Sequence, residues 1–155
     1  MRLTQFSDYA LRTLLYLRVH QDRAVPLAEV ARSYGISYHH LVKVAVLLGE
    51  LGVVATTRGR AGGYRLAKDP VDINLGWLIR QTEPDFHLVE CFDRATDSCS
   101  ITPACKLRGV LMEATRSFLA VLDGYTLADF PASAAHGERL VQLWADRHAL
   151  SLAAG

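Results

Sequence analysis

The segment LAEVARSYGISYHHLVKVAVLLGELG (residues 27–52) constrains the fold more than any other part of the chain. Leu27 and Val30 have helical spacing before a break at Gly35, and apolar residues resume that spacing after it. Gly35 can end the first helix in a left-handed conformation, and Ser37 can cap the second. The pattern predicts a helix-turn-helix. The second helix would begin with Tyr38, His39, His40 and Lys43.

The next segment, VVATTRGRAGGYRLA (residues 53–67), predicts two short strands around a glycine-rich tip. The strands are expected at residues 53–57 and 64–67. The glycines do not form a phosphate-binding loop, because the pattern G-x-x-x-x-G-K-S/T is absent. A basic hairpin directly after a helix-turn-helix is typical of a winged helix, so its arginines are expected to reach DNA phosphates or the minor groove. These arginines are Arg58, Arg60 and Arg65.

Charge is distributed unevenly along the chain, although the formal net charge is only +1. Residues 1–70 carry ten Lys or Arg and five Asp or Glu, a net +5, whereas residues 71–155 carry seven and eleven, a net −4. A basic N-terminal half predicts a polyanion partner for that half only. Combined with the helix-turn-helix and the wing, the asymmetry predicts binding to double-stranded DNA. An ordinary hairpin with solvated arginines is the alternative.

Helical patterns also lie on both sides of this unit. A first helix is predicted over residues 4–20, with Thr4 as its N-cap, and a short one over residues 74–83. Thr102 and Pro103 are expected to open a long helix that continues to about residue 123.

The long helix carries an apolar stripe that predicts an interface with a second copy of the chain, because reading an inverted repeat requires a dimer. The stripe consists of Leu107, Val110, Leu111, Ala114, Phe118, Val121 and Leu122. The expected fold class is mainly α with a small β-hairpin: a winged helix-turn-helix domain (residues 1–83), a cysteine-bearing loop (84–105), and a dimerisation helix with a short following segment (103–130). Residues 131–155 form a C-terminal extension of unknown role, in which residues 131–136 are expected to be a flexible joint before a last helix.

Nothing in the sequence predicts export or membrane insertion. Asp8 and Arg12 interrupt the apolar residues of the N-terminal run with helical spacing, so no secretion signal is expected there. No apolar stretch approaches the roughly 20 residues that span a membrane. The expected compartment is the cytoplasm, in which thiols stay reduced.

All three cysteines lie in one stretch, CFDRATDSCSITPAC (residues 91–105), with the spacing C-x7-C-x5-C. Zinc sites are typically built on C-x2-C pairs, which this stretch lacks, so the wide spacing favours an iron–sulfur cluster. Cys105 is expected in the first turn of the long helix, where the positive helix end favours a thiolate. The residues alone leave the fourth ligand open among His87, Asp93, Asp97 and a group from elsewhere. Structural cysteines, zinc, and thiols that undergo reversible oxidation are the alternatives.

Four stretches together resemble the Rrf2 family of winged-helix regulators and, within it, the repressors that sense nitric oxide: LTQFSDYALRTLLYL, SYHHLVKV, RGRAGGYRLAK, and CSITPACKL with SFLAVLDGYTLADF. The resemblance covers about residues 1–130. It implies a homodimer with one iron–sulfur cluster per subunit, 4Fe–4S being favoured and 2Fe–2S possible. The implied ligands are Cys91, Cys99 and Cys105. Asp8 of the partner subunit would be the fourth ligand, and nitric oxide, as the signal, would end repression.

Two positions depart from the family pattern. Seven residues separate Cys91 from Cys99, where the family usually has four or five, so the extra loop length bears on Cys91 as a ligand. Regulators of iron–sulfur biogenesis carry a histidine three residues after the last cysteine, and Arg108 at that position argues against that branch. The alternative function is a winged-helix regulator that senses redox or iron–sulfur status through the same cysteines. An enzyme is not expected, because neither a paired nucleophile and base nor a nucleotide motif is present.

Overall fold

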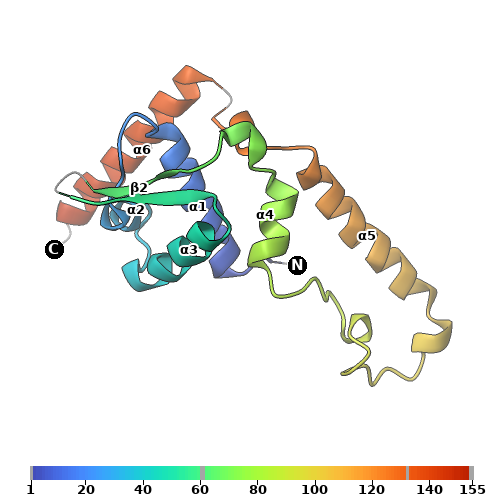
Figure 1. Cartoon of the computed structure of the whole chain (residues 1–155). Coiled ribbons are helices and arrows are strands. Elements are labelled where there is room, and N and C mark those ends of the chain that lie inside the picture. The colour runs from blue at the N-terminus through green and yellow to red at the C-terminus, as the bar shows by residue number, and fades with distance from the viewer. Residues whose placement is uncertain (1, 60–61, 132, 154–155) are drawn as a thin grey trace.

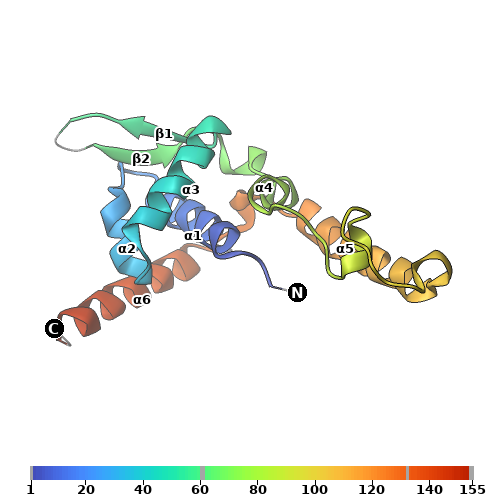
Figure 2. The same ribbon diagram turned by 90° about the horizontal axis from the view of Figure 1, so that it is seen from below.

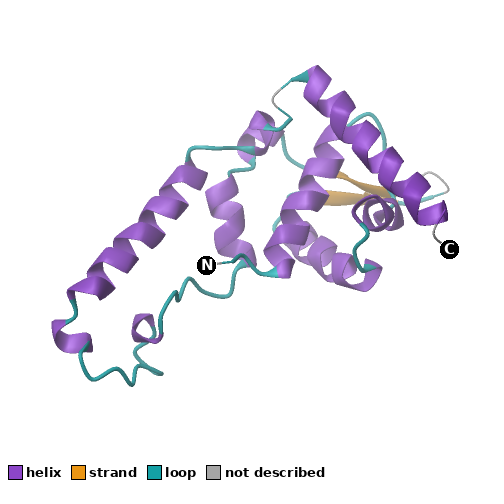
Figure 3. Cartoon of the chain, turned by 180° about the vertical axis from the view of Figure 1, so that it is seen from behind, coloured by secondary structure: helices purple, strands orange, loops and turns teal. Residues whose placement is uncertain are grey.

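The computed structural model describes residues 2–59, 62–131 and 133–153. In these parts of the chain the fold is mainly α with a small β-hairpin, as predicted (Figures 1 and 3). The main elements are α1 (Gln5–Val19), α2 (Leu27–Tyr34), α3 (Tyr38–Glu50), β1 (Val54–Thr57), β2 (Gly63–Leu66), α4 (Leu75–Thr82), α5 (Lys106–Asp123) and α6 (Ala134–Ala153). Short 3-10 helices join them: η1 (Pro70–Asp72), η2 (Glu90–Phe92), η3 (Thr102–Ala104) and η4 (Leu127–Asp129).

Local capping explains the three helices of the helix-turn-helix unit. The side chain of Thr4 accepts a hydrogen bond from the backbone N–H of Ser7, so α1 begins where the sequence predicts. Gly35 ends α2 in the left-handed conformation, with φ of 62°. Ser37 occupies the N-cap position of α3, but its side chain makes no capping hydrogen bond. The predicted helix-turn-helix is confirmed.

The hairpin follows α3 directly and is antiparallel, with Val54 opposite Leu66. Its second strand also pairs with the segment before α2, through a bridge between Val25 and Tyr64. Gly63 lies against the Val25 backbone, where an added Cβ would come within 2.6 Å of the carbonyl carbon. The close approach of these two backbones therefore requires glycine at position 63.

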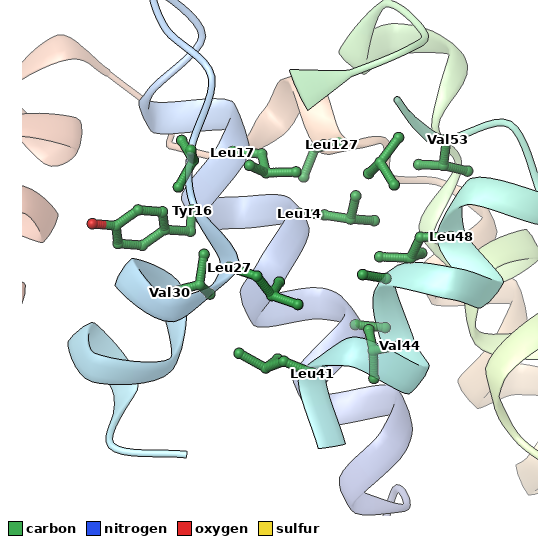
Figure 4. Close-up of a cluster of buried hydrophobic side chains, with 14 of the residues drawn as sticks. Leu14, Tyr16, Leu17, Leu27, Val30, Leu41, Val44, Leu48, Val53 and Leu127 are labelled. Atoms are coloured by element: carbon green, nitrogen blue, oxygen red, sulfur yellow. The ribbon is translucent and has the colours of Figure 1, made fainter. Parts of the chain in front are cut away.

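The hydrophobic core lies between α1, α2 and α3 and is closed by the base of the hairpin (Figure 4). The stripe of α1 meets the inner faces of α2 and α3, as helical spacing predicts. Fully buried members include Leu14, Leu17, Val30, Leu41, Val44, Leu48 and Val53. The η4 residue Leu127, far away in sequence, joins the same core.

Helix α4 connects this core to the rest of the chain. The Asn74 side chain accepts a hydrogen bond from the backbone N–H of Trp77 and thereby caps the helix. At its other end, the Ser7 hydroxyl donates to the Thr82 hydroxyl over 2.7 Å in a buried contact with α1. Glu83 accepts from both the backbone N–H and the hydroxyl of Thr4. The N-terminus of α1 is thus fixed to the segment that leads into the cysteine loop.

Helix α5 and the loop before it extend from this unit as an arm (Figures 1 and 2). The helix begins at Lys106 and not at Thr102, so the predicted start is wrong. Residues 102–104 form the separate turn η3, because the extended backbone of Cys105, with ψ of 105°, interrupts the helical path. The C-terminal end of α5 is joined to α4, where Arg80 forms an ion pair with Asp123.

The C-terminal helix α6 folds back over the helix-turn-helix unit and packs against α2 (Figure 3). The predicted flexible joint over residues 131–136 is wrong in its second half, because α6 already begins at Ala134. Trp144 is only 8% exposed and belongs to the main core. None of the described helices combines the length and apolar character that crossing a membrane requires.

Candidate nucleic-acid interface and cysteine loop

The exposed face of α3 carries the residues predicted to read DNA. Its inner face is buried in the core, so the first turn presents its polar side chains to solvent. The exposed residues are Ser37, Tyr38, His39, His40 and Lys43. A helix that is packed on one side and polar on the other, at the end of a helix-turn-helix, has the shape that enters a major groove.

Two of these residues lie on the side of α3 that faces α1. The ring centroids of His40 and Tyr9 are 6.3 Å apart. His40 and Lys43 line a cavity of about 260 Å³ together with Gln5, Phe6 and Tyr9. The N-terminal turns of α1 therefore contact α3 directly.

The predicted wing arginines have different surroundings. Arg58 is exposed at the end of β1, where it is free to approach a phosphate. Arg65 lies on β2, and its Nη1 donates to the backbone carbonyl of Gln21 over 3.3 Å. Arg65 thus joins the hairpin to the loop after α1. Arg60 lies outside the described residues.

The three cysteines lie on the arm, and none forms a disulfide. Cys91 is buried in η2, whereas Cys99 and Cys105 are half-buried. Cys91 and Cys99 line the same cavity of about 450 Å³. Cys105 is the N-cap residue of α5, so it lies at the positive end of an 18-residue helix rather than in its first turn as predicted.

Polar and basic residues surround this cavity. Arg94 and Arg108 line it, and Arg108 Nε donates to the Cys91 carbonyl over 2.9 Å. Asp97 accepts hydrogen bonds from the Cys99 backbone N–H and the Thr102 hydroxyl, which order the loop between the cysteines. Among the described residues, no three His, Cys, Asp or Glu side chains converge closely enough to hold a single metal ion.

The thiols nevertheless fit a cluster better than a single ion. Ligands of a cluster bind different iron atoms and need not converge on one point. Cys91 and Cys99 share one cavity beside two guanidinium groups, which offset the negative charge that bound thiolates and sulfides bring. Cys105, Cys99 and Cys91 are the residues that would hold the group.

Asp8 lies in the first turn of α1. Its Oδ1 accepts from Arg12 Nε over 2.9 Å, and its Oδ2 lies 2.8 Å from Arg12 Nη2. The guanidinium of Arg12 also stacks over the ring of Tyr34, 5.6 Å from its centroid. The carboxylate is 41% exposed and so is accessible to a second molecule.

One polar cluster was not predicted from the sequence. Tyr16 donates a hydrogen bond to Glu29 over 2.8 Å, and the Ser33 hydroxyl donates to Tyr16 over 3.1 Å. Arg23 forms an ion pair with Glu29. The hydrogen bond from Arg23 lowers the pKa of Glu29, and burial raises the pKa of Tyr16. These residues lie up to 17 positions apart, so no local spacing could have predicted the cluster.

Fold and interface together define the class: a winged helix-turn-helix DNA-binding regulator whose arm carries three thiols. The model of the Rrf2 family, described as "Iron-dependent Transcriptional regulator", matches residues 3–133. The chain belongs to the Rrf2 family. It is a transcriptional regulator and not an enzyme.

Relatives and a solved structure agree with this assignment. The chain is 49% identical to the HTH-type transcriptional regulator NsrR of Halalkalibacterium halodurans over 130 residues, which are 83% of this chain and 89% of the relative. It is also 49% identical to NsrR of Bacillus subtilis, with 83% and 89% covered. The structure of IscR from T. potens superposes with a TM-score of 0.67 at 28% identity, covering 87% of this chain and 90% of the other.

Proposed function

We propose that the chain is a homodimeric repressor that holds an iron–sulfur cluster and releases DNA when nitric oxide attacks that cluster. The grouping of three free thiols on one arm carries the proposal, and two of them, Cys91 and Cys99, line a cavity together with two arginines. The family description names iron, and the relatives are NsrR regulators at 49% identity. These two findings favour the cluster over zinc or a bare thiol sensor.

The exposed stripe of α5 supports the homodimer. Leu107, Val110 and Val121 are 60–62% exposed and lie on one side of the helix. Large apolar side chains at this spacing are typical of a helix that packs against a partner. A second copy related by twofold symmetry would cover the stripe and place two recognition helices on an inverted-repeat operator.

The three cysteines of the arm and Asp8 of α1 then have roles in binding the cluster. Cys91, Cys99 and Cys105 would bind the cluster as thiolates, and the helix N-terminus at Cys105 would favour that charge. Asp8 of the partner subunit would be the fourth ligand, a harder and more readily displaced donor than thiolate. When bound, the cluster supplies ferrous iron, to which nitric oxide binds. We propose a 4Fe–4S cluster, with 2Fe–2S as the alternative. The iron and sulfide content per subunit distinguishes the two.

The connection from the cluster to DNA would pass through α1. Asp8 precedes Tyr9, and Tyr9 contacts His40 of the recognition helix. A displaced Asp8 would return to Arg12, with which it pairs in the single chain. Movement of this turn would then change the relative position of the two recognition helices and lower the affinity for DNA.

An anaerobic visible spectrum before and after stoichiometric nitric oxide tests the proposal. The purified protein is expected to be brown, and its cluster absorption to collapse with nitric oxide. C99S is expected to lose the absorption, whereas S100A, a change in the same cavity, should retain it. A protein that stays colourless after anaerobic reconstitution with iron and sulfide would overturn the cluster. If the D8A variant keeps its cluster content, nitric oxide response and DNA affinity, Asp8 is not the fourth ligand, and the rest of the proposal stands.

A further inference from the structure

The C-terminal helix α6 contacts the turn between α2 and α3. The Trp144 ring packs against the rings of Tyr16 and Tyr34, with centroids 4.5 Å and 5.5 Å away, and the two tyrosine rings are 6.1 Å from each other. Tyr34 is the last residue of α2, directly before the turn at Gly35. Aromatic contacts of this kind are favourable beyond the area that they bury. Helix α6 therefore packs against the C-terminal end of α2.

Arg147 makes the second contact, one helical turn further along α6. Its guanidinium lies against Gly35, where any added Cβ would collide with it. Gly35 closes α2, so the cation lies where the carbonyl end of that helix concentrates negative charge. Position 35 favours glycine because its backbone is left-handed, and the absence of a side chain there lets the Arg147 guanidinium approach the turn closely.

We infer that α6 is a positioning element for DNA reading: Trp144 and Arg147 hold the end of α2 and the turn at Gly35, and thereby set the angle of α3. The family model ends at residue 133, before α6 begins, so this role goes beyond the family assignment. It is also independent of the cluster, because neither residue lies on the arm. The proposed role of α6 concerns the approach of α3 to DNA.

Affinity for two DNA duplexes tests the inference. The first is the tightest-binding 40-base-pair duplex that the wild-type protein recovers from a randomised pool, and the second is an unrelated duplex of the same length. W144A and R147A are expected to weaken binding to the selected duplex about tenfold, as the loss of correctly placed base contacts would. Binding to the unrelated duplex should change less than twofold, because phosphate contacts tolerate small rotations.

Salt dependence separates positioning from direct contact. If Arg147 acts through Gly35, the slope of log affinity against log salt stays at the wild-type value in R147A. A slope that falls by about 1 would show that Arg147 contacts a phosphate itself and would overturn the inference. Unchanged affinity for the selected duplex in R147A would overturn it as well.

Two further variants keep the test interpretable. W144F retains a ring against Tyr34 and is expected to restore most of the selected-duplex affinity, even where W144A loosens α6. L143A removes an apolar side chain from the 46% exposed outer face of the same helix and should leave both affinities unchanged. The anaerobic spectrum of each variant reports the cluster separately, so a protein without a cluster would not be mistaken for a failure of α6.

Discussion

Leu14 of α1 and Leu107 of α5 are the same side chain in opposite surroundings: the first is fully buried, and the second is 62% exposed. The helix-turn-helix unit around Leu14 buries its apolar residues within one chain. The arm around Leu107 leaves its stripe uncovered and is attached mainly through α4. The apolar residues of the first region are covered within the single chain. The second region exposes a row of large apolar side chains, as one side of a protein–protein interface does.

The largest expected effect follows from exchanging leucine for alanine in the two regions. L14A removes a fully buried side chain and should lower the free energy of unfolding by ~2–5 kcal/mol, since the core cannot fill the cavity. L107A should cost far less in dilute protein, and its cost should grow with protein concentration as dimers form. Urea unfolding at several concentrations measures both. Equal costs at every concentration would contradict the contrast between the two regions.

A charge placed on the stripe tests the arm directly. V110E introduces a carboxylate at a position that is 60% exposed in the single chain and that a second copy would cover. An unpaired buried charge is strongly unfavourable, so the variant is expected to be monomeric in sedimentation velocity while keeping the helical circular dichroism of the wild type. A120E makes a similar change at an exposed position of α5 that does not belong to the stripe, and it should remain dimeric. A dimeric V110E protein would place the interface elsewhere.

The smallest expected effect concerns the polar cluster between α1 and α2. The pKa of Glu29 is lowered by Arg23, so its ionised form stabilises the fold above the unfolded pKa of about 4.3. E29Q should reduce the free energy of unfolding by about 1 kcal/mol at pH 7, because the Arg23 side chain is 40% exposed and solvent screens the pair.

This difference between wild type and E29Q should shrink as the pH falls below about 4.3 and through the lower folded pKa. Urea titrations between pH 7 and pH 3 measure it. A difference that is constant with pH would mean that the carboxylate charge contributes nothing to the unit.

Features set within one or two helical turns could be predicted from the sequence. Thr4 caps α1, Gly35 closes α2 and Asn74 begins α4, because capping groups and helical ladders involve residues at most four positions apart. The exposed polar start of α3 was predictable for the same reason. The start of α5 shows the limit of such local prediction. Thr102 and Pro103 suit the start of a helix, but the extended backbone of Cys105 makes α5 begin at Lys106.

Contacts between distant residues left no local signal in the sequence. Trp144 has the spacing of an apolar face, yet only the fold shows that this face covers Tyr16 and Tyr34. Arg65 fits a wing arginine by position, whereas its hydrogen bond to Gln21 follows from the approach of the hairpin to the loop after α1. The sequence by itself determined the class of fold, the helix-turn-helix and the grouping of three thiols, because periodicity, caps and spacing are local. Only the tertiary structure decided that α6 braces the turn, because packing joins residues that the chain keeps more than a hundred positions apart.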